Sequence, residues 1–412
     1  MRDSAPTAAA YVCAVSCTIL LAVGVVPAGA QTVTFDRHPT LHVPAGEIEL
    51  RARVDGLLFS PSERQGLDAD ATWETRRIEV DGTFFKKLEF QLSYELGDSV
   101  EPEGHQYLNY RFNRRFEIRA GRFKMPFSRD ELTGGSDLSF VFRSMAARQI
   151  APGRDVGVMA HGRTRNRAFS YQAGYFLRDG THARTSQTEG GHDAVAGRVV
   201  VAPFAATTHR LFAPLEIGTN VVTSRLDNQL GLRGENVFKD GVFFDRSFVN
   251  GRRFRQGVEA SWSLGPVSLS AERDVVTDQR VGMGLQGEDL PDVRATGWYV
   301  AGTWTVVGET KDGRATPRES LFDGGWGAVQ VAGRIERLAF GTVDGGAMPT
   351  VGAAPPDNHD RVGTVGVSWF LNRYFKVQGN WVYESIGDPV RSPAPNAGGR
   401  LPRGVLQFQF TL

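Results

Sequence analysis

The sequence predicts an all-β fold, a transmembrane antiparallel β-barrel of about 16 strands that runs from residue 46 to residue 412. Many segments alternate strictly between apolar and polar residues, as two-faced strands do. After residue 30, no apolar run approaches the roughly 18 residues that a membrane helix needs. The links between predicted strands run mostly long and short in turn, which is typical of barrels with long external loops and short periplasmic turns. No Pro- or Ser-rich linker divides the chain, so we expect a single domain after the N-terminal segments.

Residues 1–30 have the pattern of a cleaved secretory signal peptide rather than of a membrane anchor. Arg2 precedes an apolar run over 8–26, and Ala28-Gly29-Ala30 is a small-x-small cleavage site. Both cysteines, Cys13 and Cys17, lie inside this segment. The mature chain therefore needs no disulfide, thiolate nucleophile or Cys-ligated metal. Residues 31–45 are expected to form a short N-terminal segment before the barrel.

The predicted strands follow the period-two pattern. In 46–58, GEIELRARVDGLL, Ile48 and Leu50 share one face, while Arg51 and Arg53 lie on the other. Sixteen such segments are placed near 46–60, 73–83, 86–97, 104–112, 115–124, 153–163, 167–179, 192–202, 212–224, 253–265, 266–276, 294–307, 325–337, 361–372, 374–385 and 402–412. A sheet in lipid must close because an open edge leaves backbone groups without partners. Sixteen strands leave an aqueous lumen.

One link breaks the alternation of long and short links, and the assignment of one further segment is open. The link 307–325 is too long for a periplasmic turn, and 236–248, NVFKDGVFFDRSF, is either an additional strand or a loop folded against the wall.

The third external loop, 125–152, is the candidate pore constriction. From residue 111 to 167 the chain has 13 Lys or Arg and five Asp or Glu, although its formal net charge is +1. Arginines at a constriction attract anions and replace part of their hydration. The candidate pore and anion-binding residues are Arg115, Arg119, Arg122, Lys124, Arg129, Arg143, Arg148 and Arg154. Alternatively, these residues pair with Asp130, Glu131, Asp137 and Asp155 and fix the loop to the wall, or contact lipopolysaccharide or a neighbouring subunit.

Several segments resemble the phosphate-selective porin O/P family. They are WETRRIEVDGTFFKKLEFQLSYEL, AGRFKMPFSRDELTGGSDLSFVFRSMAARQIAPGRDVGV and SYQAGYF within 73–177, GPVSLSAE at 265–272, GWYVAGTWTVVGE at 297–309 and GGWGAVQVAGRIERL at 324–338. The resemblance implies a sixteen-stranded barrel, usually trimeric, with loop three folded into the pore. Phosphate-specific members have a ladder of arginines and lysines down the lumen. Here the predicted lumen face includes Glu47, Glu49, Asp55, Glu79, Asp81, Glu89, Glu95 and Glu117, so a mixed lumen is expected.

The predicted function is passive diffusion of small hydrophilic solutes across the bacterial outer membrane, biased toward small anions such as phosphate. The expected partners are these anions, outer-membrane lipid with lipopolysaccharide, and two further copies in a homotrimer, but no nucleic acid. No catalytic residue, cofactor or metal site is predicted, since the eight His show no HExxH or other metal-ligand spacing. The alternatives are an outer-membrane barrel enzyme and a surface binding or adhesion protein.

Overall fold

The computed structural model describes residues 32–36, 38–62, 66–96, 103–182, 191–207, 210–311, 313–343, 357–391 and 399–412. The predicted signal peptide, 1–30, lies outside these residues. Within them, no helix is long and apolar enough to cross a membrane.

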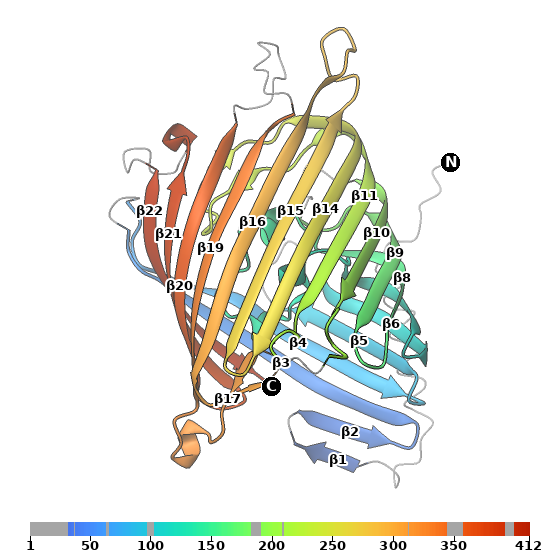
Figure 1. Ribbon diagram of the computed structural model, residues 1–412, viewed down its shortest axis with the longest axis vertical. Coiled ribbons are helices and arrows are strands. Elements are labelled where there is room, and N and C mark those ends of the chain that lie inside the picture. The colour runs from blue at the N-terminus through green and yellow to red at the C-terminus, as the bar shows by residue number, and fades with distance from the viewer. Residues whose placement is uncertain are drawn as a thin grey trace.

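Sixteen antiparallel strands form a closed ring (Figure 1). They are β3 (Gly46–Phe59), β4 (Asp70–Phe84), β5 (Leu88–Glu95), β6 (Glu103–Asn113), β7 (Phe116–Lys124), β8 (Arg154–Arg163), β9 (Phe169–Arg178), β10 (His192–Val201), β11 (Glu216–Leu230), β14 (Phe248–Leu264), β15 (Val267–Arg280), β16 (Leu290–Val307), β19 (Ala328–Thr342), β20 (Asn358–Phe370), β21 (Phe375–Ile386) and β22 (Arg400–Thr411). Each of the sixteen predicted strands has its counterpart, which confirms the fold class.

The ring closes where β22 pairs with β3, from Val405 opposite Phe59 to Thr411 opposite Arg53. The last residue, Leu412, exchanges backbone hydrogen bonds with Ala52. Beyond this point the edge of β3 continues, and β2 (Pro39–Val43) pairs with its first residues, while β1 (Thr32–Phe35) pairs with β2. The predicted N-terminal segment is thus a hairpin that covers the part of β3 that β22 does not reach.

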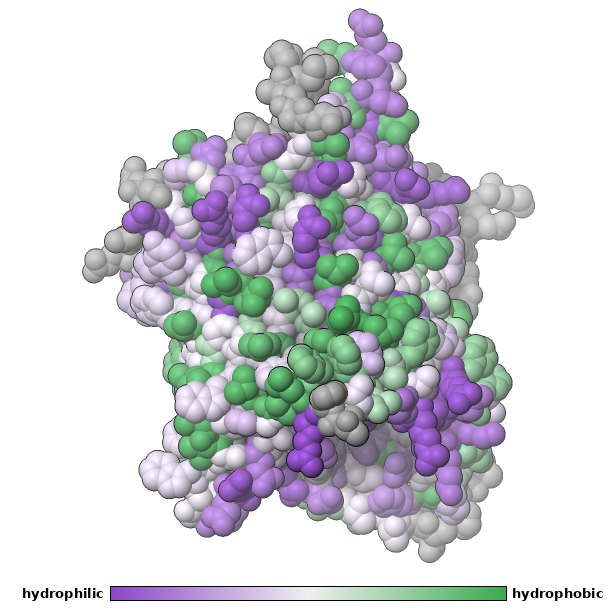
Figure 2. Space-filling view, in the orientation of Figure 1, coloured by the Kyte–Doolittle hydropathy of each residue, from purple (hydrophilic) through white to green (hydrophobic). Residues whose placement is uncertain are grey.

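The outer surface carries the apolar phase of the strands. Side chains such as Val300, Trp304, Ile335, Val365 and Trp381 are exposed on it. Figure 2 shows apolar residues gathered as a band across the middle of the visible face, with hydrophilic residues above and below. An exposed apolar belt of this kind matches the hydrocarbon layer of a membrane.

The link 307–325 and the segment between β11 and β14 both contain short strands. In the link after β16, β17 (Glu309–Lys311) pairs with β18 (Arg314–Thr316), and a 3-10 helix, η3 (Leu321–Asp323), follows. Between β11 and β14, β12 (Gly234–Glu235) pairs with β13 (Val242–Phe244). Another 3-10 turn, η4 (Pro389–Arg391), lies between β21 and β22.

Candidate functional site: the channel beside loop 3

Loop 3, predicted as residues 125–152, spans 125–153 between β7 and β8 and lies across the lumen of the barrel. It contains α2 (Arg129–Leu132), η2 (Gly135–Asp137) and α3 (Met145–Gln149). Ser128 and Ser144 begin the two helices, and each hydroxyl accepts the N–H of the residue three positions later. Buried apolar residues, among them Phe127, Met145 and Ile150, join the loop to the main hydrophobic cluster inside the barrel.

Carboxylates of the distant wall hold the loop by its backbone and hydroxyl donors. Glu272 of β15 accepts hydrogen bonds from the Ser128 hydroxyl (2.8 Å) and the Asp130 N–H (2.9 Å). Glu336 of β19 accepts the N–H of Met145 (2.6 Å). A buried donor or acceptor left without a partner is costly, so these hydrogen bonds are strongly favoured. The wall formed by β15 and β19 therefore fixes the path of loop 3.

The segment between β11 and β14, residues 231–247, is folded inward as well. Its Val237 donates its N–H to Glu384 of β21 (2.5 Å) and accepts a hydrogen bond from Arg148 of loop 3 (2.5 Å). Glu235 and Gln149 exchange two hydrogen bonds of 2.7 and 2.6 Å. The sequence left two possibilities for this segment, an additional wall strand or a loop folded against the wall. The structure shows the folded loop, which contains the short strands β12 and β13.

A cavity of about 830 Å³, named the channel, remains between loop 3 and the wall formed by β3, β4, β7 and β10. Among the described residues, its lining has eleven cationic and four anionic side chains. The cationic ones are Arg51, Arg53, Arg77, Arg119, Lys124, Arg143, Arg148, Arg154, Arg198, Lys239 and Arg314, and the anionic ones are Glu74, Glu79, Glu131 and Asp137. The channel surface is therefore strongly basic.

The mixed lumen expected from the sequence describes the wall but not the open channel. The eight acidic residues predicted for the lumen face lie on β3, β4, β5 and β7, the same side as the channel arginines, and among the described lining residues only Glu79 of the eight occurs. Acidic residues that point inward from the wall under loop 3 and the 231–247 segment are buried, namely Glu272, Asp274, Glu336, Asp360 and Glu384. These two loops cover carboxylates and leave the opposite, arginine-bearing wall in contact with the lumen. The open channel therefore differs in charge from the average of the inward-facing residues.

Many cations of the channel also have a carboxylate partner. Arg77 pairs with Glu95 (3.0 Å), and Arg51 pairs with Asp81 (3.1 Å). In contrast, no ion pair within the described chain involves Arg119, Arg148, Arg154 or Lys239, so their charges are not neutralised by a direct partner. Arg119 lies with its guanidinium carbon 4.2 Å from the centre of the Tyr107 ring. A guanidinium over an aromatic ring keeps its outer N–H groups available for a solute.

The predicted site residues fall into four groups. Arg119, Lys124, Arg143, Arg148 and Arg154 line the channel. Arg115 lies in the exposed turn between β6 and β7, before the first residue of β7. Arg122 is buried on β7 opposite Val156 of β8. Arg129 lines a separate cavity beside the channel.

Two of the channel residues fix loop 3, as the alternative interpretation of the arginine cluster expected. The Glu131 carboxylate forms ion pairs with Lys124 (3.4 Å) and Arg143 (3.7 Å). Burial alone would raise the pKa of Glu131, but the charges of Lys124 and Arg143 outweigh it and lower the pKa to about 2. Burial lowers the pKa of His182, so its ring is neutral at pH 7, with Nδ1 donating to the Ala151 carbonyl (2.9 Å).

The candidate site missed Arg51, Arg53, Arg77, Arg198, Lys239 and Arg314. A signal for Arg51 and Arg53 was present, because both lie on the polar phase of an alternating strand. For Arg314 no comparable signal existed, since the hairpin that carries it occupies an irregular link. No group of three or more His, Cys, Asp or Glu within the described ranges is arranged to hold a metal ion.

Comparison with known proteins assigns the chain to a family. The family described as "Phosphate-selective porin O and P" matches residues 55–385. The chain belongs to this porin family. Its sequence is 22% identical to Porin O of Pseudomonas aeruginosa over 367 residues, which cover 80% of each chain. Together with the closed barrel, this membership places the protein in the outer membrane as a porin.

Solved structures of outer-membrane proteins have the same fold. The anion-selective porin from Comamonas acidovorans superimposes with a TM-score of 0.56 at 14% identity, covering 89% of this porin and 100% of that chain. OmpT of Vibrio cholerae superimposes with a TM-score of 0.58 at 13% identity, covering 90% and 100%. A trimer form of Vibrio cholerae OmpT gives a TM-score of 0.55 at 12% identity, covering 89% and 100%.

Proposed function

We propose that this porin gives passive diffusion of small hydrophilic solutes with a preference for small anions, phosphate among them, and that the channel beside loop 3 sets the preference. The observation that supports the proposal is the lining of eleven cations and four anions. A cationic surface around a narrow aqueous path raises the local concentration of anions and lowers that of cations. Several separate arginines suit transport, since each site must also release its ion.

The test is the reversal potential of single channels in a planar bilayer under a KCl gradient. Anion preference gives a chloride-to-potassium permeability ratio above one. A ratio below one would refute the anion preference, while the absence of any open step would refute the channel itself and favour a barrel enzyme or a surface binding protein. Adding phosphate to the KCl bath should reduce the chloride current if phosphate occupies the channel.

The assembly and the surroundings of the barrel belong to the same proposal. A homotrimer is supported by family resemblance and by the trimer form of Vibrio cholerae OmpT. It should appear as a complex of three 45.1 kDa chains, less any cleaved leader, in native mass spectrometry from detergent. We also propose cleavage of residues 1–30, testable by N-terminal sequencing of the outer-membrane form, and contact of the outer belt with lipid and lipopolysaccharide.

A further inference from the structure

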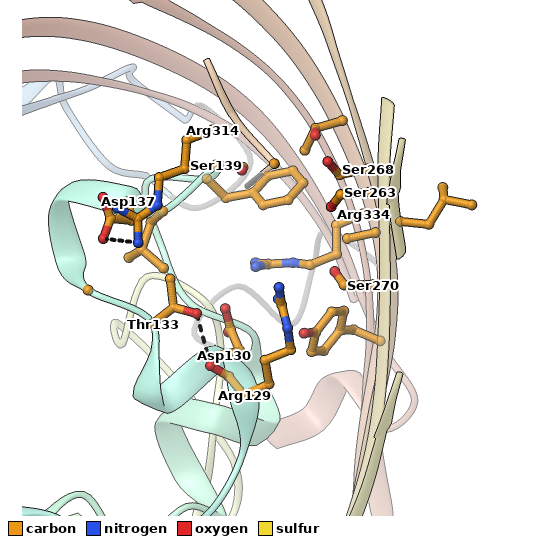
Figure 3. Close-up of a pocket in the computed structure, with 18 of the residues that line it drawn as sticks. Arg129, Asp130, Thr133, Asp137, Ser139, Ser263, Ser268, Ser270, Arg314 and Arg334 are labelled. Atoms are coloured by element: carbon orange, nitrogen blue, oxygen red, sulfur yellow. Dashed lines mark hydrogen bonds and ion pairs between the residues drawn. The ribbon is translucent and has the colours of Figure 1, made fainter. Parts of the chain in front are cut away.

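The two ends of loop 3 have different surroundings. Near its start, Arg129 borders the side cavity, a space of about 270 Å³ beside the wall formed by β14, β15 and β16 (Figure 3). The other end, residues 150–153, leads directly into Arg154, the first residue of β8, whose side chain lines the channel. The position of Arg154 therefore depends on how this second end of the loop is held.

A short segment that follows β9, residues 179–182, lies against this end of loop 3. The His182 N–H donates to the Pro152 carbonyl (3.2 Å), and the Nδ1 of the same residue donates to the Ala151 carbonyl (2.9 Å). These two hydrogen bonds fix the backbone of the loop just before it enters β8.

The same segment also contacts the first residues of β8. The Arg154 N–H donates to the Thr181 hydroxyl (3.4 Å), and the Gly180 N–H donates to the Asp155 carboxylate (2.9 Å). Gly180 has a φ of 85°, and a Cβ at this position would overlap the Pro152 carbonyl oxygen, so the close approach requires glycine. The path of the backbone on both sides of Arg154 is therefore set by this segment.

Asp179, the first residue of the segment, is the centre of a buried network. Its carboxylate accepts hydrogen bonds from Arg253 (2.6 Å), from both terminal nitrogens of Arg255 and from the Ser224 hydroxyl (2.7 Å). Arg253 also donates two hydrogen bonds of 2.6 Å to Asp278. Asp179 and the two arginines are at most 1% exposed. Buried charges are tolerated when they are paired and hydrogen-bonded, and here two cations meet two anions.

Arg255 connects this network to loop 3. Its Nε donates to the Ile150 carbonyl (2.7 Å), while its terminal nitrogens donate to Asp179. The guanidinium group is planar and its donors have a fixed geometry, so the bond to Asp179 sets the direction of Nε. Asp179 thus holds the end of loop 3 by two routes, through Arg255 and through the segment that it begins.

We propose that Asp179 is a positioning residue for ion selectivity, which holds the end of loop 3 so that the Arg154 side chain faces the channel. This inference rests on the anion preference proposed for the channel, and it adds a determinant outside the channel lining, because Asp179 is fully buried and absent from that lining. Arg154 has no ion pair among the described residues, so the backbone rather than a carboxylate partner directs its charge.

The positioning role and the charge of Asp179 predict opposite results for Asp179→Asn. The variant removes a negative charge, so an effect of the electrostatic field alone would raise the chloride-to-potassium permeability ratio. In the positioning role, Arg255 loses part of its acceptor, becomes an uncompensated buried cation and no longer fixes the Ile150 carbonyl. We expect the ratio to fall about two- to fivefold, up to the effect of removing a unit charge about 5 Å from an ion.

The assay is the reversal potential of single channels of the full mature chain under a KCl gradient. Asp278→Asn is the matched control, because Asp278 is a buried aspartate that also binds Arg253 and undergoes the same change of charge. No hydrogen bond or ion pair within the described ranges joins Asp278 to Arg255 or to loop 3. The control should keep the wild-type ratio or raise it slightly.

A double variant shows whether the effect passes through Arg154. Arg154→Gln alone should lower the ratio about fivefold, since it removes a unit charge from the channel. Adding Asp179→Asn should lower the ratio no further, because the charge that Asp179 positions is already absent. Additive decreases would instead show that Asp179 acts on selectivity independently of Arg154.

Two milder variants carry the test if Asp179→Asn does not fold, as judged by heat-modifiable gel mobility. Arg255→Lys keeps the positive charge but lacks the planar set of donors that reaches both Asp179 and Ile150, so a lower ratio can come only from geometry. Thr181→Val removes the hydroxyl that accepts the Arg154 N–H and should lower the ratio by a smaller factor.

Four results would overturn the proposal. They are an unchanged or raised ratio in folded Asp179→Asn, an equal fall in Asp278→Asn, additive decreases in the double variant, and wild-type ratios in both Arg255→Lys and Thr181→Val. A wild-type ratio below one would refute the anion preference of the channel. The differences among the variants would still decide the role of Asp179, so the two proposals can fail separately.

Discussion

Replacing Arg119 by Gln should lower the anion preference of the channel. Arg119 faces the channel from β7 and has no ion pair among the described residues, so its whole charge acts on the passing ion. A unit charge about 5 Å from an ion contributes about 0.8 kcal/mol in water, and screening at 0.1 M salt reduces this to about 0.5 kcal/mol. Removing it disfavours the anion and favours the cation by that amount. The chloride-to-potassium permeability ratio should therefore fall about fivefold.

The assay is the reversal potential of single channels under a tenfold KCl gradient. Arg115→Gln is the matched control, because Arg115 is the same residue type four positions earlier and lies in the exposed turn outside the channel lining. The control should keep the wild-type ratio. The assignment of the channel to the arginine-bearing wall would be refuted by either of two results. One is a chloride-to-potassium permeability ratio in Arg119→Gln equal to that of the wild type, and the other is the same change of this ratio in Arg119→Gln and Arg115→Gln.

Three other predictions concern screening, pH and the docking of loop 3. The permeability ratio should approach one between 0.1 and 1 M KCl as the Debye length shortens from about 10 to 3 Å, and a constant ratio would exclude steering by charge. The ion pairs of Glu131 stabilise loop 3 fully above the ordinary pKa of 4.5 and are lost as the pH falls through about 2, so current noise should rise only in that acid range. In Glu131→Gln the noise should be present at pH 7, and a quiet variant would contradict the role of these pairs. In Gly297→Ala the new Cβ would lie 2.6 Å from the Cβ of Ala146 in α3, so the loop must shift and the conductance should change. Gly333→Ala, with nothing within 4 Å of its Cβ, is the control and should conduct as wild type.

The strands could be predicted from sequence because each is constrained locally. A strand between lipid and water must alternate, and period two is visible without knowledge of any neighbour. The same phase placed Arg51 and Arg53 on the inner face. Strand ends were less accurate, as in β14, which begins at Phe248 rather than near 253. At that end of β14 the residues no longer alternate between apolar and polar, so the sequence pattern does not show that strand pairing continues.

The sequence could not predict which cavity each arginine of loop 3 lines. Arg129 and Arg143 are close in sequence and both belong to loop 3, yet one lines the side cavity and the other lines the channel. Which direction each takes depends on contacts with strands more than a hundred residues away, such as that of Ser128 with Glu272. Such pairings leave no periodic trace in the sequence.

The charge of the channel and the position of loop 3 have a common cause. A buried carboxylate is tolerated when it accepts several hydrogen bonds, and loop 3 supplies these to Glu272 and Glu336 from its backbone and Ser128. The loop is therefore stabilised where the buried carboxyl groups of β15 and β19 accept its donors. Docking removes negative charge from the lumen surface without removing any residue. The channel lining is therefore basic although the chain is nearly neutral, and a count of charges along the strands does not predict this.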